Sequence, residues 1–148
     1  MKRDMDLCRS ILLDLEAQTA DLGDSNFGFD HTSAATRVKT SYDTYSNHLN
    51  LLYQAGFVEG WVKRGKARQS GPDAKTEVVH DYVAFVMPRG ITWDGYEYLE
   101  TIRDPEIWRK TQAGATRLGN FSIDVIKELA LGFVKQKIKQ HTGVEIDI

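Results

Sequence analysis

One stretch of the chain, residues 41–87, decides its fold: SYDTYSNHLNLLYQAGFVEGWVKRGKARQSGPDAKTEVVHDYVAFVM. Its first part, 41–55, places apolar residues every three or four positions and is followed by a glycine, which predicts an amphipathic helix. Segments 57–63 and 78–87 are rich in Val, Tyr and Phe and predict two strands. Between them, the Gly- and Pro-containing segment 64–75 predicts a loop. The stretch therefore predicts a helix followed by a β-hairpin.

The chain on either side of this stretch is predicted to be mostly helical. Upstream, helical spacing predicts a first helix over 4–18, small polar residues predict a loop over 21–33, and 35–40 is predicted as a short strand. Downstream, Thr92 and Ser122 are suited to cap the starts of helices. Between them, Asp104-Pro105 restarts the chain with Pro in a first helical turn, which predicts two helices in tandem or one helix with a sharp break. The last of these helices is predicted over 123–140.

This order of elements is that of a winged helix-turn-helix protein, in which the hairpin forms the wing. The usual middle helix of that fold is missing or very short in the predicted order. A length of 148 residues fits one domain. We therefore expect an α+β fold in a single domain over 1–148, with a winged-helix-like core over 1–91 and a helical extension over 92–148 packed on it.

Composition narrows the class of protein. The formal net charge is −2 and the isoelectric point about 6.1, below the value of about 9 that nucleic-acid-binding domains often exceed. A local basic patch can still bind phosphate, because salt screens distant charges.

The one cysteine, Cys8, excludes an internal disulfide and is expected to be buried and inert. The four histidines lack zinc spacing, and no apolar run suits a membrane span, so we expect a cytoplasmic protein without metal or cofactor.

Four segments together resemble a known family: MKRDMDL at 1–7, YSNHLNLLYQAGFVEG at 45–60, ITWDGYEYLETIRDPEIWRKT at 91–111 and FSIDVIKELA at 121–130. In this order they look like an uncharacterised family of small phage and prophage proteins, unknown-function family 2513. The resemblance implies a winged-helix-like fold and a bacterial or phage setting, and it implies no biochemical activity. The segment 21–35 and the basic hairpin are longer here than in the family's pattern.

The strongest candidate site is the basic segment of the predicted hairpin. It sets five cations against one acid, Asp73, which gives a formal balance of +4. The cations are Lys63, Arg64, Lys66, Arg68 and Lys75. Duplex DNA suits such a cluster, because each neutralised phosphate releases counterions. The alternative is a solvated loop whose cations keep a hairpin edge soluble. We favour phosphate binding.

A second candidate is the polar side of the helix over 41–55. Its members are Asp43, Asn47, Asn50 and Gln54. Asn and Gln can make bidentate hydrogen bonds to adenine in the major groove. Asp43 would repel phosphate, however, and this side of the helix carries no cation, so an ordinary exposed face is the favoured interpretation. Arg37 and Lys39, just before the helix, could supply the missing phosphate contacts.

Four aromatic residues in the second half of the chain could stack on unpaired bases. They are Trp93, Tyr96, Tyr98 and Trp108. Their spacing favours a different role, because Trp93 and Tyr96 continue to Leu99 and Ile102 as one helical stripe. We therefore expect these aromatic residues to pack in the core.

The last predicted helix has an apolar arc of roughly 200°, wider than one packing partner covers. The arc includes Ile126, Leu129, Phe133, Val134 and Ile138. Two interpretations stay open: the helix wedges between two parts of its own domain, or it forms the seam of a homodimer. Lys127 and Lys137 lie inside the arc and would have to extend their ammonium groups to solvent.

The sequence contains no catalytic constellation. It lacks a Walker-type phosphate loop, a nucleophile elbow and an HExxH pair, so we expect a protein that is not an enzyme. Our leading hypothesis is a phage- or prophage-encoded winged-helix protein that binds duplex DNA, with the wing on phosphates and the helix over 41–55 near the groove. The alternative is a protein-interaction module that docks on a host or phage complex in a regulatory or anti-defence role.

Overall fold

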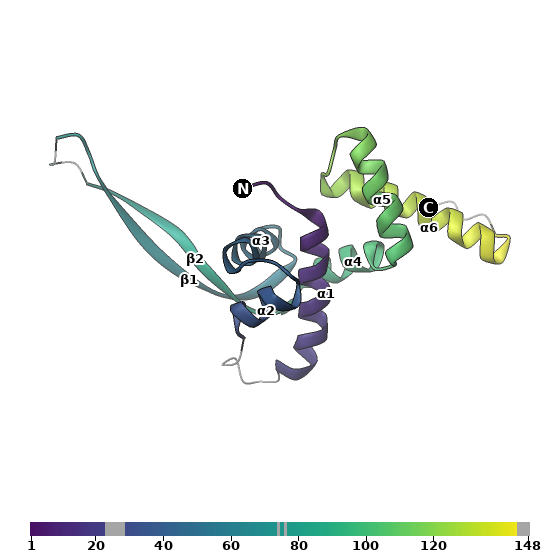
Figure 1. Ribbon diagram of the computed structural model, residues 1–148, viewed down its shortest axis with the longest axis horizontal. Helices are drawn as coiled ribbons and strands as arrows, with labels where there is room; N and C mark the ends of the chain where they lie inside the picture. Colours follow the sequence, from purple (N-terminus) through teal and green to yellow (C-terminus); the bar gives the residue numbers. More distant parts are fainter. Residues whose placement is uncertain (23–28, 74, 76, 145–148) are drawn as a thin grey trace. The chain divides into compact units, whose positions relative to one another are not determined.

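The computed structural model describes residues 1–22, 29–73, 75 and 77–144. Over these residues the chain forms an α+β structure of six helices and one two-stranded antiparallel sheet (Figure 1). The contacts divide it into two compact units, Met1–Gly95 and Tyr96–Ile148. The elements are α1 Met5–Leu22, α2 His31–Arg37, α3 Tyr42–Gln54, β1 Val58–Ser70, β2 Glu77–Ile91, α4 Trp93–Ile102, α5 Pro105–Leu118 and α6 Ile123–Thr142.

The predicted strand over 35–40 is wrong, because α2 occupies this part of the chain. Asp30 accepts hydrogen bonds from the Thr32 amide and the Ser33 hydroxyl, which fixes the first turn of a helix. The predicted loop over 21–33 is therefore too long at both ends, because 21–22 belong to α1 and 31–33 to α2; its residues 23–28 lie outside the described part of the chain. The first unit thus contains three helices before the hairpin.

The core of the first unit lies between α1, α3 and the base of the hairpin. Its fully buried side chains are Ile11, Leu12 and Leu15 from α1, Tyr45 and Leu49 from α3, and Val58 and Val86 from the two strands. Tyr42 lies about one helical turn before Tyr45, but 48% of it is exposed. As the first residue of α3, it lies at the rim of this core, with its ring 6.2 Å from that of His31.

Two buried histidines connect the helices of the first unit. The Asp4 amide donates to Nε2 of His48 at 2.9 Å, so the proton of this ring lies on Nδ1 and is donated to the Thr44 carbonyl at 2.8 Å. Nε2 of His31 donates to the Val86 carbonyl at 2.7 Å. These bonds tie α1 to α3 and α2 to β2, and they give both rings structural roles.

The strands are longer than predicted, and the predicted loop over 64–75 is wrong. Residues 64–70 belong to β1 and pair with 77–83 of β2, from Arg64 opposite Val83 to Ser70 opposite Glu77. A glycine inside a strand weakens it unless a neighbour covers the gap. Here the Tyr82 ring lies over Gly65, where an added Cβ would be 2.6 Å from the ring.

The base of the hairpin depends on two further close approaches. A bulge follows Glu59, and a Cβ added at Gly60 would collide with the Met87 carbonyl. At Gly95, in the first turn of α4, an added Cβ would collide with the Phe57 carbonyl. Thr92 caps α4 as predicted, because its hydroxyl accepts from the Gly95 amide while donating to the Gly56 carbonyl at 2.5 Å.

The second unit contains the helical hairpin of α5 and α6, in which the predicted restart at Asp104-Pro105 and the predicted cap Ser122 are confirmed. Asp104 accepts hydrogen bonds from the amides of Glu106 and Ile107, and Ser122 accepts one from Val125. The α5 helix continues through Gly114 and ends at Gly119, which has a φ of 66°.

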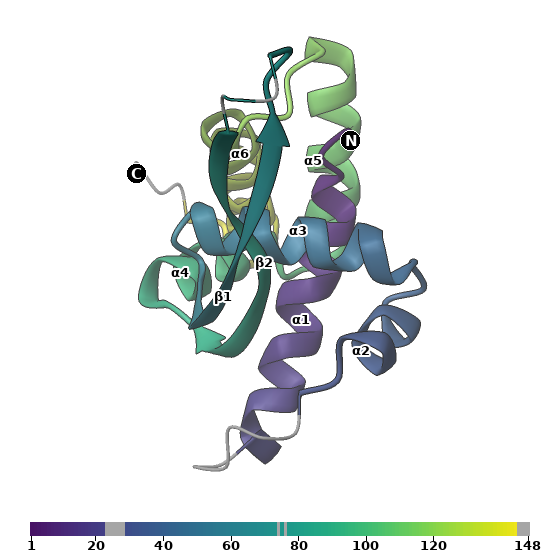
Figure 2. The same cartoon turned by 90° about the vertical axis from the view of Figure 1, so that its left-hand side faces the viewer.

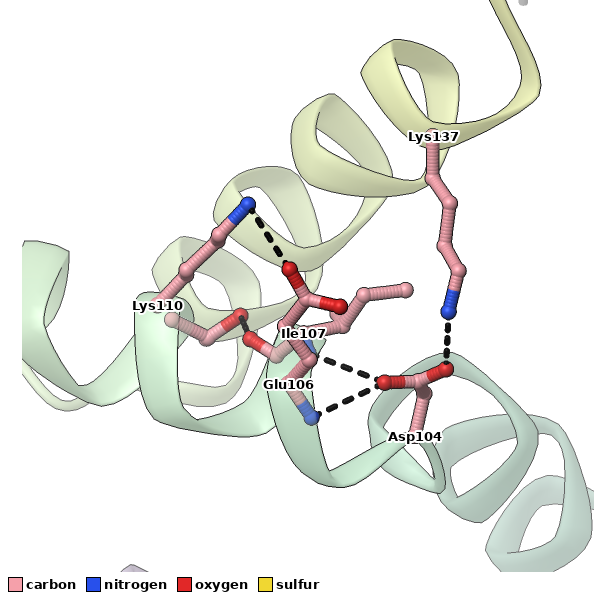
Figure 3. A network of polar contacts seen from close by, with 6 residues as sticks. Asp104, Glu106, Ile107, Lys110 and Lys137 are labelled. Carbon is pink, nitrogen blue, oxygen red and sulfur yellow. Dashed lines mark hydrogen bonds and ion pairs between the residues drawn. The ribbon is translucent and has the colours of Figure 1, made fainter. Parts of the chain in front are cut away.

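An ion pair joins the cap of α5 to the middle of α6. Figure 3 shows Lys137 reaching from α6 to the second oxygen of Asp104, at 2.5 Å. The hydrogen bond from Lys137 is the main cause that lowers the pKa of Asp104. The same carboxylate therefore starts α5 and holds α6 beside it.

Candidate nucleic-acid interface

The distal part of the hairpin, which we call the arm, comprises residues 64–70 and 77–83. It extends away from α1, α2 and α3 (Figure 1), and Figure 2 shows its strands twisting about each other. Alternate side chains of a strand point to opposite faces. Arg64, Lys66 and Arg68 therefore share one face of the arm, which we call the cationic face.

Two acids from β2 share this face and were missing from the count made on the sequence. Asp81 lies directly opposite Lys66, and a Glu77 oxygen lies 3.6 Å from Nε of Arg68. Across 63–81, five cations thus stand against three acids, a formal balance of +2 instead of +4. The balance of +4 omitted both acids because it covered only residues 63–75. Strand pairing brings the two acids onto the cationic face.

The other two predicted wing cations lie elsewhere on the hairpin. Lys63 precedes a bulge at the base, and its ammonium group lies 5.6 Å from the centre of the Phe85 ring. Phe85 in turn contacts His31, so Lys63 caps an aromatic cluster at the junction with α2. Lys75 is exposed between the two strands. The five predicted cations therefore do not form one surface.

The polar side of α3 is partly as expected. Asp43, Asn47 and Gln54 are exposed and available to a partner. Asn50 is half-buried, and its Oδ1 atom and the Ser46 hydroxyl are buried without a hydrogen-bond partner in the described part of the chain. The part of α3 that could contact bases is accordingly smaller than the sequence indicated.

Arg37 and Lys39 differ in their surroundings. The guanidinium of Arg37 makes two hydrogen bonds to the Asp14 carboxylate, at 2.8 and 3.0 Å, and the bond to Asp14 is the main cause that raises its pKa. This fork joins α2 to α1. Lys39 is exposed, with a φ of 58° in the turn after α2. Arg37 therefore serves the fold, and Lys39 is the accessible cation of the two.

The expectation that the four aromatic residues pack in the core is only half right. Tyr98 and Trp108 are buried, whereas Trp93 is 79% exposed and Tyr96 is also exposed. The buried stripe of α4 is formed by Tyr98, Leu99 and Ile102, so the stripe begins later than predicted. Trp93, at the first position of α4, lies outside it.

Three comparisons place the chain among known proteins. Residues 2–121 match the family described as "Hypothetical protein (DUF2513)". The chain belongs to this family. A relative in Haemophilus influenzae, described as an uncharacterized protein, is 31% identical over 144 residues, which cover 93% of this chain and 99% of the relative. No solved structure matches the chain. The DUF2513 assignment confirms the family resemblance, while the phage setting stays a prediction.

The structure exposes further residues of this DUF2513 protein that the sequence did not single out. Trp61 is 62% exposed on β1, and Val78, Val79 and Tyr82 are about half exposed on the arm. An alternation of apolar and polar residues normally predicts which face of a strand is buried. It does not apply to the arm, because both faces of the arm are exposed. Val78, Val79 and Tyr82 make the arm partly apolar as well as basic.

The remaining candidate surface is the apolar arc of α6. Ile126 is buried, while Leu129, Phe133, Val134 and Ile138 are half-buried.

Among the described residues, no helix is long and apolar enough to cross a membrane, and no three His, Cys, Asp or Glu side chains gather as a metal site would need. Cys8 is buried as expected, and burial raises its pKa to about 11.

Proposed function

We propose that this protein is a phage- or prophage-encoded winged-helix protein that binds duplex DNA through the cationic face of its hairpin arm. The order α1, α2, α3, β1, β2 supports the winged-helix assignment, because α2 takes the place of the middle helix of that motif. The observation that carries the proposal is the alignment of Arg64, Lys66 and Arg68 on one face of a projecting ribbon. A two-stranded ribbon also fits the width of the major groove.

Two acidic side chains on the cationic face compete with phosphate for its cations. Glu77 and Asp81 already lie beside Arg68 and Lys66, so a phosphate must displace or share these carboxylates. Exposed ion pairs of this kind are weak, which makes the exchange feasible. Base contacts in this proposal come from the exposed amides of Asn47 and Gln54 on α3. We expect DNA binding of modest affinity and steep salt dependence.

The test compares two variants that lose the same charge. In one, Arg64, Lys66 and Arg68 become Ser; in the other, Lys63, Lys75 and Arg89 become Ser. Fluorescence anisotropy of a duplex is measured over a range of salt concentrations. We expect the first variant alone to lose binding, with the slope of log K against log salt reduced by up to about 2.7 for three lost phosphate contacts.

Two results would overturn the proposal. If the wild type does not bind a duplex at low salt, the protein is not a DNA-binding protein of this kind. If both variants lose affinity equally, net charge and not the cationic face governs binding. Circular dichroism of each variant establishes that the fold is retained.

A second function is favoured by the exposed apolar side chains. Trp61 and Trp93 are largely exposed, and exposed aromatic residues are typical of protein-binding surfaces. The alternative proposal is a protein-interaction module that docks on a host or phage complex. Partner capture should then survive loss of the cationic face and fail when Trp61 becomes Ser.

A further inference from the structure

The two edges of the arm differ in chemistry. The β1 edge, 64–70, reads RGKARQS, and its charges and glycine discourage pairing with another strand. The β2 edge, 77–83, reads EVVHDYV and is rich in β-branched and aromatic residues. Val78, Val79 and Tyr82 are 45%, 49% and 50% exposed. The β2 edge therefore has the composition of an inner strand but lies at the side of a sheet.

The arm also lacks the support that a ribbon of two strands normally needs. Among its described residues only Gly65 and Val83 are even partly buried. A two-stranded ribbon is marginally stable in water unless further strands or a helix pack on it. Both observations indicate that another strand belongs on the β2 edge.

We propose that the β2 edge of the arm pairs antiparallel with the β2 edge of a second copy of this chain, with the two-fold axis at His80. The product is a four-stranded sheet with β1 strands outside and β2 strands inside. The seam is isologous, as in most homodimers, because the same residues meet from both copies. This pairing goes beyond the proposed DNA binding and does not depend on it.

Strand length and charge together select His80 as the centre of the pairing, because this centre lets all of 77–83 pair without opposing like charges. It is the midpoint of 77–83, the regular segment of β2 between the tip and the bulge at the base. A centre at Val79 would set Glu77 against Asp81 of the second copy twice, and a centre at Asp81 would oppose that acid to itself. Like charges directly opposite are destabilising.

The His80 register instead creates favourable neighbours. It sets Val78 against Tyr82 of the second copy, an aromatic and β-branched pair of the kind that stabilises sheets. It also sets Asp81 against Val79 of the second copy. A two-fold axis between antiparallel neighbours is perpendicular to the sheet, so equivalent faces of both copies lie on the same side.

The cationic faces therefore lie together in the dimer. The outer β1 strands are three strand spacings apart, about 14 Å, which exceeds the screening length of about 8 Å at physiological salt. Repulsion between the two sets of cations is accordingly small. Pairing doubles the basic surface without opposing like charges at the seam.

A charge exchange at the centre tests this proposal. His80→Lys and His80→Glu each set like charges opposite one another, so we expect each variant alone to dimerise about fivefold more weakly or worse. An equimolar mixture of the two should recover the dimer, because Lys then faces Glu. Ala67→Lys is the matched control, since Ala67 lies opposite His80 on the same face but on the β1 edge.

Mass is measured by sedimentation equilibrium over a range of protein concentrations, without DNA. The proposal predicts a wild-type dimer, weakened association for each His80 variant, recovery in the mixture and no effect of Ala67→Lys. A wild type that stays monomeric throughout overturns the proposal. So does a dimer that is equally stable in both His80 variants, which would place the seam elsewhere, for instance on α6.

A cysteine at the axis supplies a second readout that does not rely on destabilisation. His80→Cys should form a disulfide-linked dimer under mild oxidation, while Ala67→Cys should not. The native Cys8 does not interfere, because it is buried. Equal cross-linking of both variants, or of neither, would contradict the pairing. Duplex binding by a protein that stays monomeric would leave the proposed DNA function standing and remove only this inference.

Discussion

At the scale of single residues, two glycines of this protein have opposite surroundings. A Cβ at Gly95 would collide with the Phe57 carbonyl, whereas a Cβ at Gly132, also in a helix, would meet nothing within 4 Å. We expect Gly95→Ala to destabilise the fold by about 1–3 kcal/mol, as overpacking does. Gly132→Ala should stabilise it by about 0.5–1 kcal/mol through helix propensity.

Urea denaturation followed by circular dichroism measures both effects. The two variants add the same methyl group to a helical glycine, so they serve as controls for each other. Equal stability of the two proteins would show that the chain at Gly95 moves away from Phe57 without cost.

Cys8 provides a second prediction at this scale. Burial raises the pKa of its thiol from 9.0 to about 11, and only the thiolate reacts. At pH 8 the thiolate fraction should be ~100-fold lower than that of an ordinary thiol, so alkylation by iodoacetamide should be at least that much slower. Labelling followed by mass spectrometry measures the rate. Unfolding in urea should restore the ordinary rate, and rapid labelling of the folded protein would contradict the burial.

At the scale of elements, the contact between α5 and α6 should depend on pH. The pKa of Asp104 is lowered chiefly by its hydrogen bond from Lys137. A lowered carboxyl pKa contributes stability that is present above the unfolded value of about 3.8. That contribution is lost as pH falls through the lower folded value.

Asp104→Asn isolates this effect, because Asn caps a helix as well as Asp does but cannot pair with Lys137 as a charge. We expect the variant to be less stable than the wild type at pH 7, with the difference shrinking below about pH 4. Lys137→Met should give the same pH profile. Thermal unfolding at several pH values measures it, and a difference that does not change with pH would exclude the ion pair as its source.

The elements themselves were predictable where local chemistry decides them. Thr92 and Ser122 cap helices as predicted, because a side chain that accepts hydrogen bonds from the next turn is a local signal. The outer half of β1 was not predictable, since RGKARQS has the composition of a loop. It becomes a strand only because 77–83, on the other side of the hairpin turn, pairs with it.

The candidate site was predictable only in part for the same reason. Arg64, Lys66 and Arg68 were identified from their density in the sequence, and strand alternation places them on one face. Their acidic neighbours are set by cross-strand register, which no local pattern reveals. Arg37 was assigned to DNA because Asp14, its partner, is 23 positions away. The exposure of Trp93 likewise depends on where the buried stripe of α4 begins.

At the scale of the whole molecule, charge is distributed unevenly. The formal net charge is −2, whereas residues 63–81 carry +2, so the rest of the chain carries −4. Electrostatic attraction of a polyanion is therefore confined to this segment of the hairpin and opposed by the charge of the rest of the chain. Small changes in the charge of the arm should have large effects on DNA binding.

Neutralising the two acids of the cationic face tests this prediction. In Glu77→Gln with Asp81→Asn, Arg68 and Lys66 lose their internal competitors, and we expect tighter duplex binding with a steeper dependence on salt. The matched control removes two exposed acids of α6, Asp124→Asn with Glu128→Gln. Anisotropy titrations compare the two variants. If the control gains as much affinity as the arm variant, the effect belongs to net charge and not to the arm.

The close approach at Gly60 limits how this gene can vary. Every single-base change that replaces glycine introduces a side chain with at least a Cβ, and at this position any Cβ would collide with the Met87 carbonyl. No single-base change of this codon can therefore alter the amino acid without disturbing the fold. In a library of random point mutants selected for folded protein, position 60 should return only synonymous changes, while the open position Gly132 should accept several residues.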